Sequence, residues 1–230
     1  MPEDENPALD KSSEENYLYF TLPMALNYQR DSYKLWAAAH ETFKDAETRM
    51  VFNPRAVVRM NTLELREKLV RHKVALQPNK HIEIWQTLCR TFAQNPIKNL
   101  FEQNDSDVVR LKTHIPKNKK DFPYLSGPKI LNYWLYVMEQ YTDLTLQNRQ
   151  SITIAPDTHV IQASVRLGLL NQSETTRSDV RDYVSSLWHN LLRGQPVMPI
   201  DIHTPLWLWS RNGFQFDVSS GGTHDKKYHL

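Results

Sequence analysis

Apolar residues recur at every third or fourth position through most of the chain, the spacing that gathers them on one face of an α-helix. The stretch Leu22–Phe43 predicts an early helix with Pro23 at or just before its start. A second helix is predicted over 61–76, with Asn61 or Thr62 as its N-cap. The apolar side of this second helix is expected to contain Leu63, Leu65, Leu69 and Val70.

The later part of the chain continues the helical pattern. A third helix is predicted over 80–95, with apolar residues at helical spacing at Ile84, Leu88 and Phe92. The segment 129–141 is apolar on nearly every face, which is typical of a helix at the centre of a core. The segment 158–170 has one apolar face and follows Asp157, a suitable N-cap. The sequence therefore predicts an all-α fold.

The two ends of the chain lack this pattern. Residues 1–16 are polar and acidic, and residues 219–230 are polar and rich in Gly and Ser, so both are predicted to be disordered tails. A chain of 230 residues is long enough to bury one well-formed core. We therefore predict a single helical domain over 17–218.

Composition narrows the class of protein. The chain has 28 Lys and Arg against 26 Asp and Glu, so any affinity for nucleic acid must come from a local patch. Cys89 is the only cysteine, which excludes an internal disulfide, a cysteine-rich zinc site and a four-cysteine iron–sulfur cluster. No secretory signal or membrane-spanning run is evident. We expect a cytoplasmic protein, associated with the nucleoid in a prokaryote, and no membrane partner.

A basic segment occupies the middle of the chain. Six basic residues fall within 110–129, namely Arg110, Lys112, Lys117, Lys119, Lys120 and Lys129. One interpretation is a solvated loop. The other is a nucleic-acid contact, because the segment leads into a turn at Ser126 and Gly127 whose backbone amides suit a phosphate.

Two predicted helix starts carry residues suited to chemistry. Lys129 begins the central helix, where the helix dipole and burial would both favour a neutral, nucleophilic amine. The alternative is a lysine that extends from the first turn to solvent. Asp157 is fully explained as a helix cap. A carboxylate in that position can also accept backbone hydrogen bonds with one oxygen and face a substrate with the other.

Two segments together resemble a known family. "SGPKILNYWL" at 126–135 and "ITIAPDTHVIQASVRLGLL" at 152–170 resemble the hairpin-to-helix turn and the Asp-bearing helix start of helix-hairpin-helix DNA glycosylases, the endonuclease III branch above all. The hairpin motif is matched by Gly127, Pro128, Lys129 and Asn132. The later motif is matched by Asp157, Thr158, His159 and Val160, with Arg166 where an Arg follows in that branch.

The chain also departs from this family. Leu125 stands at the first of the two glycine positions of the hairpin. With a single cysteine, the C-terminal iron–sulfur cluster of the endonuclease III branch is excluded. In its place stands "PIDIHTPLWLWSRNGF" at 199–214, which is similar to cluster-free relatives such as the archaeal 8-oxoguanine glycosylases. The aromatic residues of this segment are predicted to be core anchors, namely Trp207, Trp209 and Phe214.

The resemblance implies a DNA repair enzyme. A base-excision N-glycosylase would act on a damaged base flipped out of double-stranded DNA, with 8-oxoguanine first and an oxidised pyrimidine next. Asp157 would stabilise positive charge on the sugar, and Lys129 would attack C1′ to form a Schiff base that permits strand cleavage by β-elimination. No metal or cofactor is implied, and we expect a monomer.

The resemblance also assigns contacts to DNA and to the base. Gln29 is expected to fill the gap left by the flipped base. Other expected DNA contacts are Lys117, Lys119, Lys120, Ser126, Gly127 and His159. The candidates for the base pocket are Tyr28, Trp134 and Trp207.

Three alternatives remain open. A metal-dependent hydrolase is suggested by the Asp-His pairs at 157–159 and 201–203, with His189 nearby in sequence. A helix-hairpin-helix unit can also bind nucleic acid without catalysis. Finally, the same aspartate would serve an N-glycosidase of a modified RNA base or a nucleoside.

Overall fold

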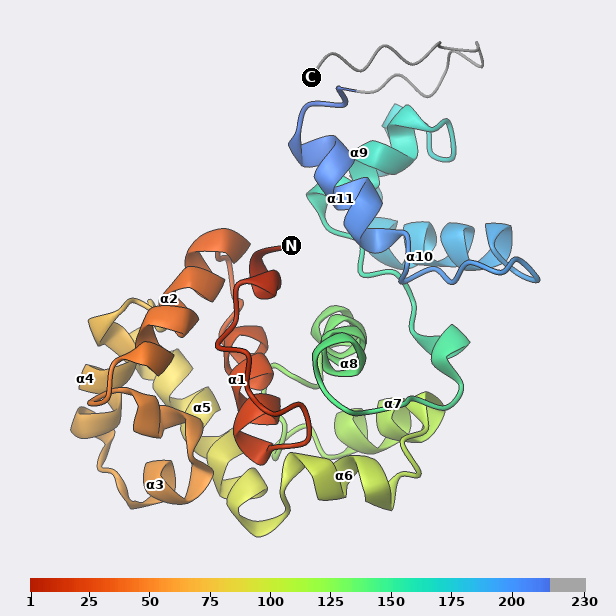
Figure 1. Ribbon diagram of the computed structural model, residues 1–230. Coiled ribbons are helices and arrows are strands. Elements are labelled where there is room, and N and C mark those ends of the chain that lie inside the picture. The colour runs from red at the N-terminus through yellow and green to blue at the C-terminus, as the bar shows by residue number, and fades with distance from the viewer. Residues whose placement is uncertain (216–230) are drawn as a thin grey trace, which may run out of the picture. The chain divides into compact units, whose positions relative to one another are not determined.

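The computed structural model describes residues 1–215, and the regular elements in this range are all helical. The all-α class predicted from the sequence is therefore confirmed. The chain divides into two compact units, Met1–Ile152 and Thr153–Leu230, instead of the single domain expected over 17–218 (Figure 1). The division lies in a stretch where residues 152–157 form no helix. The tail predicted at 219–230 lies outside the described residues.

The N-terminal unit, Met1–Ile152, contains eight α-helices. They are α1 (Glu14–Ala25), α2 (Ser32–Lys44), α3 (Pro54–Arg59), α4 (Thr62–Arg71), α5 (Pro78–Gln94), α6 (Ile97–Gln103), α7 (Val108–Lys117) and α8 (Pro128–Tyr141). Short 3-10 helices supplement them at η1 (Pro2–Asp4), η2 (Arg49–Phe52) and η3 (Arg149–Ser151).

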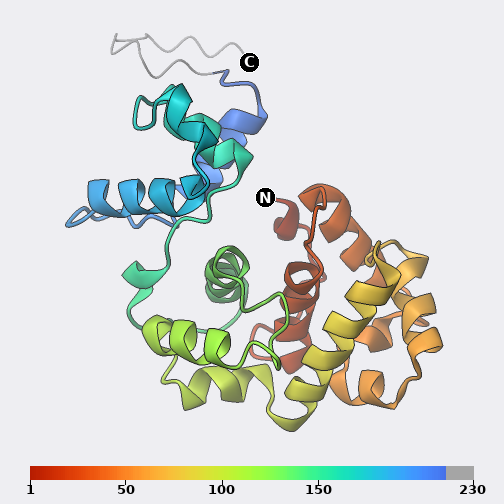
Figure 2. The same ribbon diagram turned by 180° about the vertical axis from the view of Figure 1, so that it is seen from behind.

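The core of this unit forms around α1 and α8, which pack against each other (Figures 1 and 2). Every residue of α1 from Asn16 to Ala25 is buried. Trp134 of α8 is completely buried and donates its Nε1–H to Thr21 Oγ1 of α1 at 3.0 Å. The segment 129–141 is therefore apolar because it packs in the core, as predicted from the sequence. Burial of apolar surface is the main stabilising effect in folding.

Two predicted helices form: α4 covers less than the predicted 61–76, and α5 lies close to the predicted 80–95. Asn61 caps α4, since its Oδ1 accepts the N–H of Glu64 at 2.9 Å. The apolar side of α4 is narrower than predicted. Leu65 and Leu69 are fully buried, whereas Leu63 is 68% exposed and Val70 is 36% exposed. The three apolar residues predicted to face the core from α5 are all buried, at Ile84, Leu88 and Phe92.

The early helix differs from its prediction. Pro23 lies inside the last turns of α1, and a break over 26–31 precedes α2. Asp31 starts α2, because its Oδ1 accepts the N–H of Lys34 at 3.0 Å. The apolar pattern of Leu22–Phe43 therefore spans the end of one helix and all of the next.

The N-terminal segment is anchored, in contrast to the disordered tail expected for 1–16. Glu3 is only 1% exposed and accepts a hydrogen bond at 2.5 Å from the hydroxyl of Tyr133 on α8. The pKa of Glu3 is raised, because the effect of burial outweighs the opposing effect of the hydrogen bond from Tyr133. Asn16 donates to the carbonyl of Tyr141 at 2.9 Å. The hydroxyl of Tyr133 and the carbonyl of Tyr141, both on α8, thus give this acidic segment partners that its composition alone does not reveal.

The C-terminal unit, Thr153–Leu230, is smaller in its described part. It contains α9 (Thr158–Arg166), η4 (Gln172–Thr176), α10 (Val180–Leu191) and α11 (His203–Arg211). Its core cluster consists of Ile154, Val160, Ala163, Leu170, Val184, Trp188 and Leu206. Trp188 of α10 donates its Nε1–H to the buried hydroxyl of Ser164 at 2.9 Å, which joins α10 to α9. Trp209 and Phe214 pack against this cluster, in agreement with their predicted role as anchors.

Candidate functional site

The segment 118–127 joins α7 to α8 and contains the predicted phosphate-binding turn. Its amides are already used: Ser126 N–H donates to the Phe122 carbonyl at 3.0 Å, and Gly127 N–H donates to the Tyr124 carbonyl at 3.1 Å. Tyr124 has a φ of 63°, and Leu125 is completely buried. The amides of Ser126 and Gly127 therefore do not form the expected phosphate cradle, because the tight turn satisfies them internally.

Tyr124 also joins this turn to the loop that carries Gln29. Its hydroxyl donates to the Asn27 carbonyl at 2.8 Å, and its ring meets the ring of Tyr28 at a centroid distance of 6.0 Å. Gln29 itself is exposed and has a φ of 50°. The structure thus brings together two segments expected to contact DNA. We call residues 27–30 and 118–127 the loop–turn edge.

Cations surround the loop–turn edge. Lys80 lies over the ring of Tyr28, with Nζ 3.9 Å from the ring centroid. Arg30 donates to the carbonyls of Lys73 and Val74, both at 2.8 Å. Sequence reasoning missed Arg30, Lys73 and Lys80, because only the fold places 73–80 beside residue 28. Among the described residues, no ion pair involves the three exposed lysines predicted to contact DNA, Lys117, Lys119 and Lys120.

Lys129 is the second residue of α8 and is exposed. The burial expected to favour its neutral amine is therefore absent. Gly127, the N-cap of α8, has no side chain to bind the first-turn amides. Lys129 thus lies in the first turn of a helix whose N-cap residue provides no side-chain cap.

A partly buried lysine supports this helix start. Lys112 of α7 donates to Asn132 Oδ1 at 3.0 Å and to the Ser151 carbonyl at 2.7 Å, and burial lowers its pKa. Asn132 in turn donates to the Pro128 carbonyl at 2.7 Å. Sequence reasoning treated Lys112 only as part of the basic segment. Its position one residue after buried Leu111, on the inner face of α7, was the signal for an internal role.

Asp157 is the N-cap of α9, as predicted. Its Oδ1 accepts the N–H of Val160 at 3.1 Å, and the carboxylate is partly exposed. Within residues 1–215, its second oxygen, Oδ2, accepts no hydrogen bond. Lys129 belongs to the N-terminal unit and Asp157 to the C-terminal unit, so neither unit holds both predicted catalytic residues.

His159 links α9 to α11. Its Nδ1 lies 3.2 Å from the hydroxyl of Ser210, which donates to Gln162 Oε1 at 3.1 Å. Because that hydroxyl has one proton, its bond to Gln162 leaves it as the acceptor for an Nδ1–H of His159. The imidazole also meets the ring of Trp207 edge-on, at 5.5 Å between centroids. The DNA contact predicted for His159 would therefore have to use Nε2.

The candidates for the base pocket have different environments. Trp134 is 0% exposed inside the N-terminal unit, so it is a core residue in place of the base-pocket wall proposed from the sequence. Tyr28 is half-buried in the loop–turn edge. Trp207 belongs to the C-terminal unit, is 6% exposed and has the guanidinium of Arg211 over its ring at 4.9 Å. No single unit combines these three aromatic residues.

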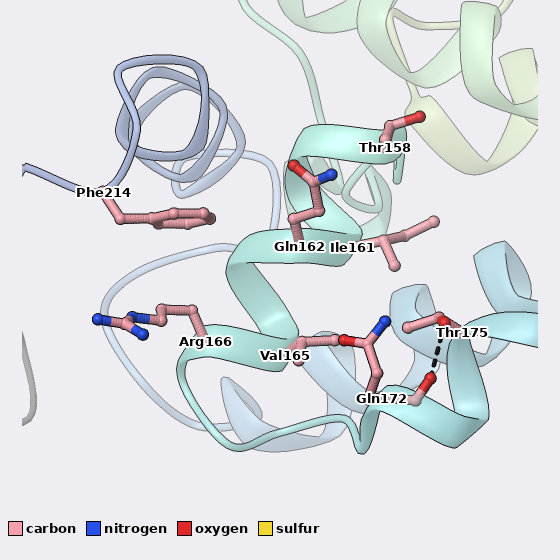
Figure 3. Close-up of a pocket in the computed structure, with 8 residues that line it drawn as sticks. All are labelled: Thr158, Ile161, Gln162, Val165, Arg166, Gln172, Thr175 and Phe214. Carbon is pink, nitrogen blue, oxygen red and sulfur yellow. Dashed lines mark hydrogen bonds between the residues drawn. The ribbon is translucent and has the colours of Figure 1, made fainter.

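An open groove of about 520 Å³ runs along the outer face of α9 (Figure 3). We call it the α9 groove; its lining residues are Thr158, Ile161, Gln162, Val165, Arg166, Gln172, Thr175 and Phe214. Sequence reasoning missed it because its walls come from α9, η4 and the residue Phe214 beyond α11. The spacing 158, 161, 162, 165 and 166 marks one helix face, which was the only available signal.

The metal-hydrolase alternative gains no geometric support. Within residues 1–215, no group of three or more His, Cys, Asp or Glu side chains is placed to hold a metal ion. The two Asp-His pairs at 157–159 and 201–203 therefore do not form such a group with His189. No helix in the same range is long and apolar enough to cross a membrane.

Comparison with known proteins identifies no relative. No family model, no curated protein and no solved structure matches the chain.

Proposed function

We propose that this chain is a DNA base-excision N-glycosylase with AP lyase activity, in which Asp157 stabilises the sugar and Lys129 is the nucleophile. The observation that carries the proposal is the geometry of Asp157. One carboxylate oxygen is held by the Val160 amide, and the other accepts no hydrogen bond within residues 1–215. A carboxylate fixed by its own helix is preorganised to stabilise developing positive charge without a reorganisation cost.

In the proposed reaction, the neutral amine of Lys129 attacks C1′ of the flipped nucleotide. The bond from C1′ to the base breaks, and its electron pair leaves with the base. Loss of an amine proton and opening of the ring at O4′ give a Schiff base. Removal of a C2′ proton then expels the 3′ phosphate by β-elimination. Asp157 stabilises the positive charge that develops on the sugar as the base leaves, and Lys129 is an exposed residue at the start of α8.

The substrate of the proposed enzyme is double-stranded DNA with a damaged base, 8-oxoguanine first. Support comes from the loop–turn edge, where exposed Gln29 lies beside cations that suit a phosphodiester backbone. We propose that Gln29 fills the space left by the flipped nucleotide. The activity would be intracellular and would require one copy of the chain.

Borohydride trapping tests the proposal directly. The chain is incubated with labelled duplexes that contain 8-oxoguanine, an oxidised pyrimidine, uracil or an abasic site, and any Schiff base is reduced to a stable adduct. Lys129→Gln is expected to reduce the amount of trapped adduct by roughly a thousandfold or more, because the variant lacks the nucleophilic amine. The matched control is Lys44→Gln, which removes the same charge from the exposed last residue of α2, outside the predicted DNA contacts, and should retain trapping.

Each other outcome contradicts the proposal in a distinct way. Binding to duplex without base release or trapping would indicate a non-catalytic nucleic-acid-binding module. Hydrolysis that EDTA abolishes would indicate metal chemistry. Release from a single-stranded RNA or a nucleoside, with none from duplex DNA, would transfer the activity to those substrates.

A further inference from the structure

The α9 groove contains a cation that no acidic side chain within residues 1–215 neutralises. Arg166, in the last turn of α9, is exposed and forms no ion pair within residues 1–215. Its guanidinium offers several N–H donors in a planar fork, which matches the oxygens of a phosphate. In Figure 3, Arg166 and Phe214 lie on one side of α9, and Gln172 and Thr175 lie on the other. The groove therefore has a positive end and an amide-bearing end.

Two carboxamides supply both donors and acceptors to the groove. The oxygen of Gln162 accepts from the Ser210 hydroxyl at 3.1 Å, so this side chain is oriented and presents its NH₂ group as a donor. The carboxamide of Gln172 forms no hydrogen bond with the described residues and can both donate and accept. The edge of a nucleobase presents both kinds of group, whereas a carboxylate presents acceptors alone.

The remaining surface of the groove is apolar and includes one aromatic ring. Ile161 and Val165 come from the same face of α9 as Arg166. Phe214 has a φ of 58°, and its N–H donates to the Trp209 carbonyl at 2.9 Å. Trp209 contacts the Phe214 ring at right angles, with 4.8 Å between the centroids. These contacts hold a flat apolar ring beside the cation, which suits a stacked base.

We propose that the α9 groove binds a nucleoside monophosphate unit, with its phosphate on Arg166, its base against Phe214 and the edge of the base toward the carboxamide of Gln162. The volume of about 520 Å³ lies within the range of about 300–1,000 Å³ that small-molecule sites occupy. The same chemistry belongs to a free mononucleotide and to one nucleotide of an unpaired strand. The site uses neither Lys129 nor Asp157, so it does not rest on the proposed glycosylase activity.

Calorimetric titration of the full chain tests this site. The probes are deoxyadenosine 5′-monophosphate, deoxyadenosine, deoxyribose 5-phosphate and a short single-stranded oligodeoxyadenylate. The mononucleotide should bind at least about tenfold more tightly than either fragment, because only it engages both Arg166 and Phe214. Binding of the oligonucleotide much more tightly than the mononucleotide would identify a strand as the source of the ligand. The reverse order would identify a free nucleotide.

Variants separate the groove from general electrostatics. Arg166→Gln should weaken mononucleotide binding at least about tenfold, and Arg166→Lys by less. Arg181→Gln removes the same charge from α10 and should leave binding unchanged. Phe214→Leu keeps apolar volume but removes the flat ring, and should weaken binding several-fold. The proposal is overturned if the mononucleotide and oligonucleotide do not bind, or if Arg166→Gln and Arg181→Gln have equal effects. Thermal unfolding of each variant confirms that it is folded.

Discussion

The helices that carry Lys129 and Asp157 begin in different ways. At α9, the carboxylate expected to act on the sugar also caps the helix. At α8, the N-cap is a glycine without a side chain, and support comes from Lys112 and Asn132 beneath it. In the proposed enzyme, the catalytic and structural roles would therefore fall to one side chain at α9 and to several side chains at α8. Mutations should separate the two roles easily at α8, and at α9 only when the replacement preserves the cap.

The largest expected effect comes from Asp157→Asn. Asparagine caps a helix about as well as aspartate but lacks the charge. We expect base release to slow by roughly 10²–10³-fold, the usual cost of removing an electrostatic stabiliser, while the free energy of unfolding stays within about 0.5 kcal/mol. Single-turnover kinetics and thermal unfolding measure the two quantities. Parallel losses in rate and stability would show that the carboxylate has only a structural role.

The start of α5 extends this comparison, because its contribution to the free energy of unfolding depends on pH. His81, near the start of α5, accepts the N–H groups of Leu76 and Gln77 at 3.2 and 3.5 Å. Burial, together with the charges of Arg30 and Lys80, lowers the pKa of His81 from 6.5 to about 4. Below pH 6.5 the unfolded chain binds a proton that the folded chain refuses until pH is near 4, so stability falls across this window.

The His81 contribution to this loss is on the order of 3 kcal/mol. Urea unfolding of the chain and of His81→Gln between pH 7 and pH 4 measures it. The variant should lose less stability over this range than the unchanged chain. Equal pH profiles for the two proteins would show that His81 does not titrate differently on folding.

The support beneath α8 should have the next largest effect. Lys112→Met removes the donor that joins Asn132 to the Ser151 carbonyl and leaves two part-buried acceptors without it. We expect a loss of about 1–3 kcal/mol in the free energy of unfolding. Lys117→Met, at the exposed end of the same helix, is the control and should stay within about 0.5 kcal/mol. A neutral result for Lys112→Met would mean that packing alone positions the start of α8.

The smallest effect isolates the cap itself. Asp157→Ala removes the Oδ1 acceptor of the Val160 amide and should cost about 1 kcal/mol of stability beyond the Asp157→Asn variant. Thermal unfolding of the two variants side by side measures this difference. Equal stability for both would show that the hydrogen bond to Val160 contributes nothing.

Local features were predictable from the sequence, and features that depend on distant segments were not. The caps at Asn61 and Asp157 act within one turn, so residue type and periodicity were sufficient to find them. The split at 26–31 was missed because the apolar pattern continues across it, from α1 into α2. The exposure of Leu63 could not be predicted, since the width of a buried face depends on what packs against it.

The candidate site shows the same limit more clearly. The residue type of Trp134 suits a base pocket, but its side chain is buried in the core, where it donates to Thr21. The amides of Ser126 and Gly127 could suit a phosphate by their position before a helix. The turn, with Tyr124 in the left-handed region, instead pairs both with its own carbonyls. Phe214 and Gln172 enter one groove only because the C-terminal unit folds α11 onto α9. Sequence identifies the residues with suitable chemistry, but their neighbours decide whether it is available.

The bond from Tyr124 to Asn27 restricts how this protein can change over evolutionary time. It joins positions 97 residues apart in the chain, so the loop at 27–30 and the turn at 118–127 meet at a fixed point. An insertion in one of them would displace the partner atom of the other. Loops usually vary freely in length. A change of length in one of these two would lose this bond, which contributes about 1 kcal/mol, unless a matching change in the other restored it.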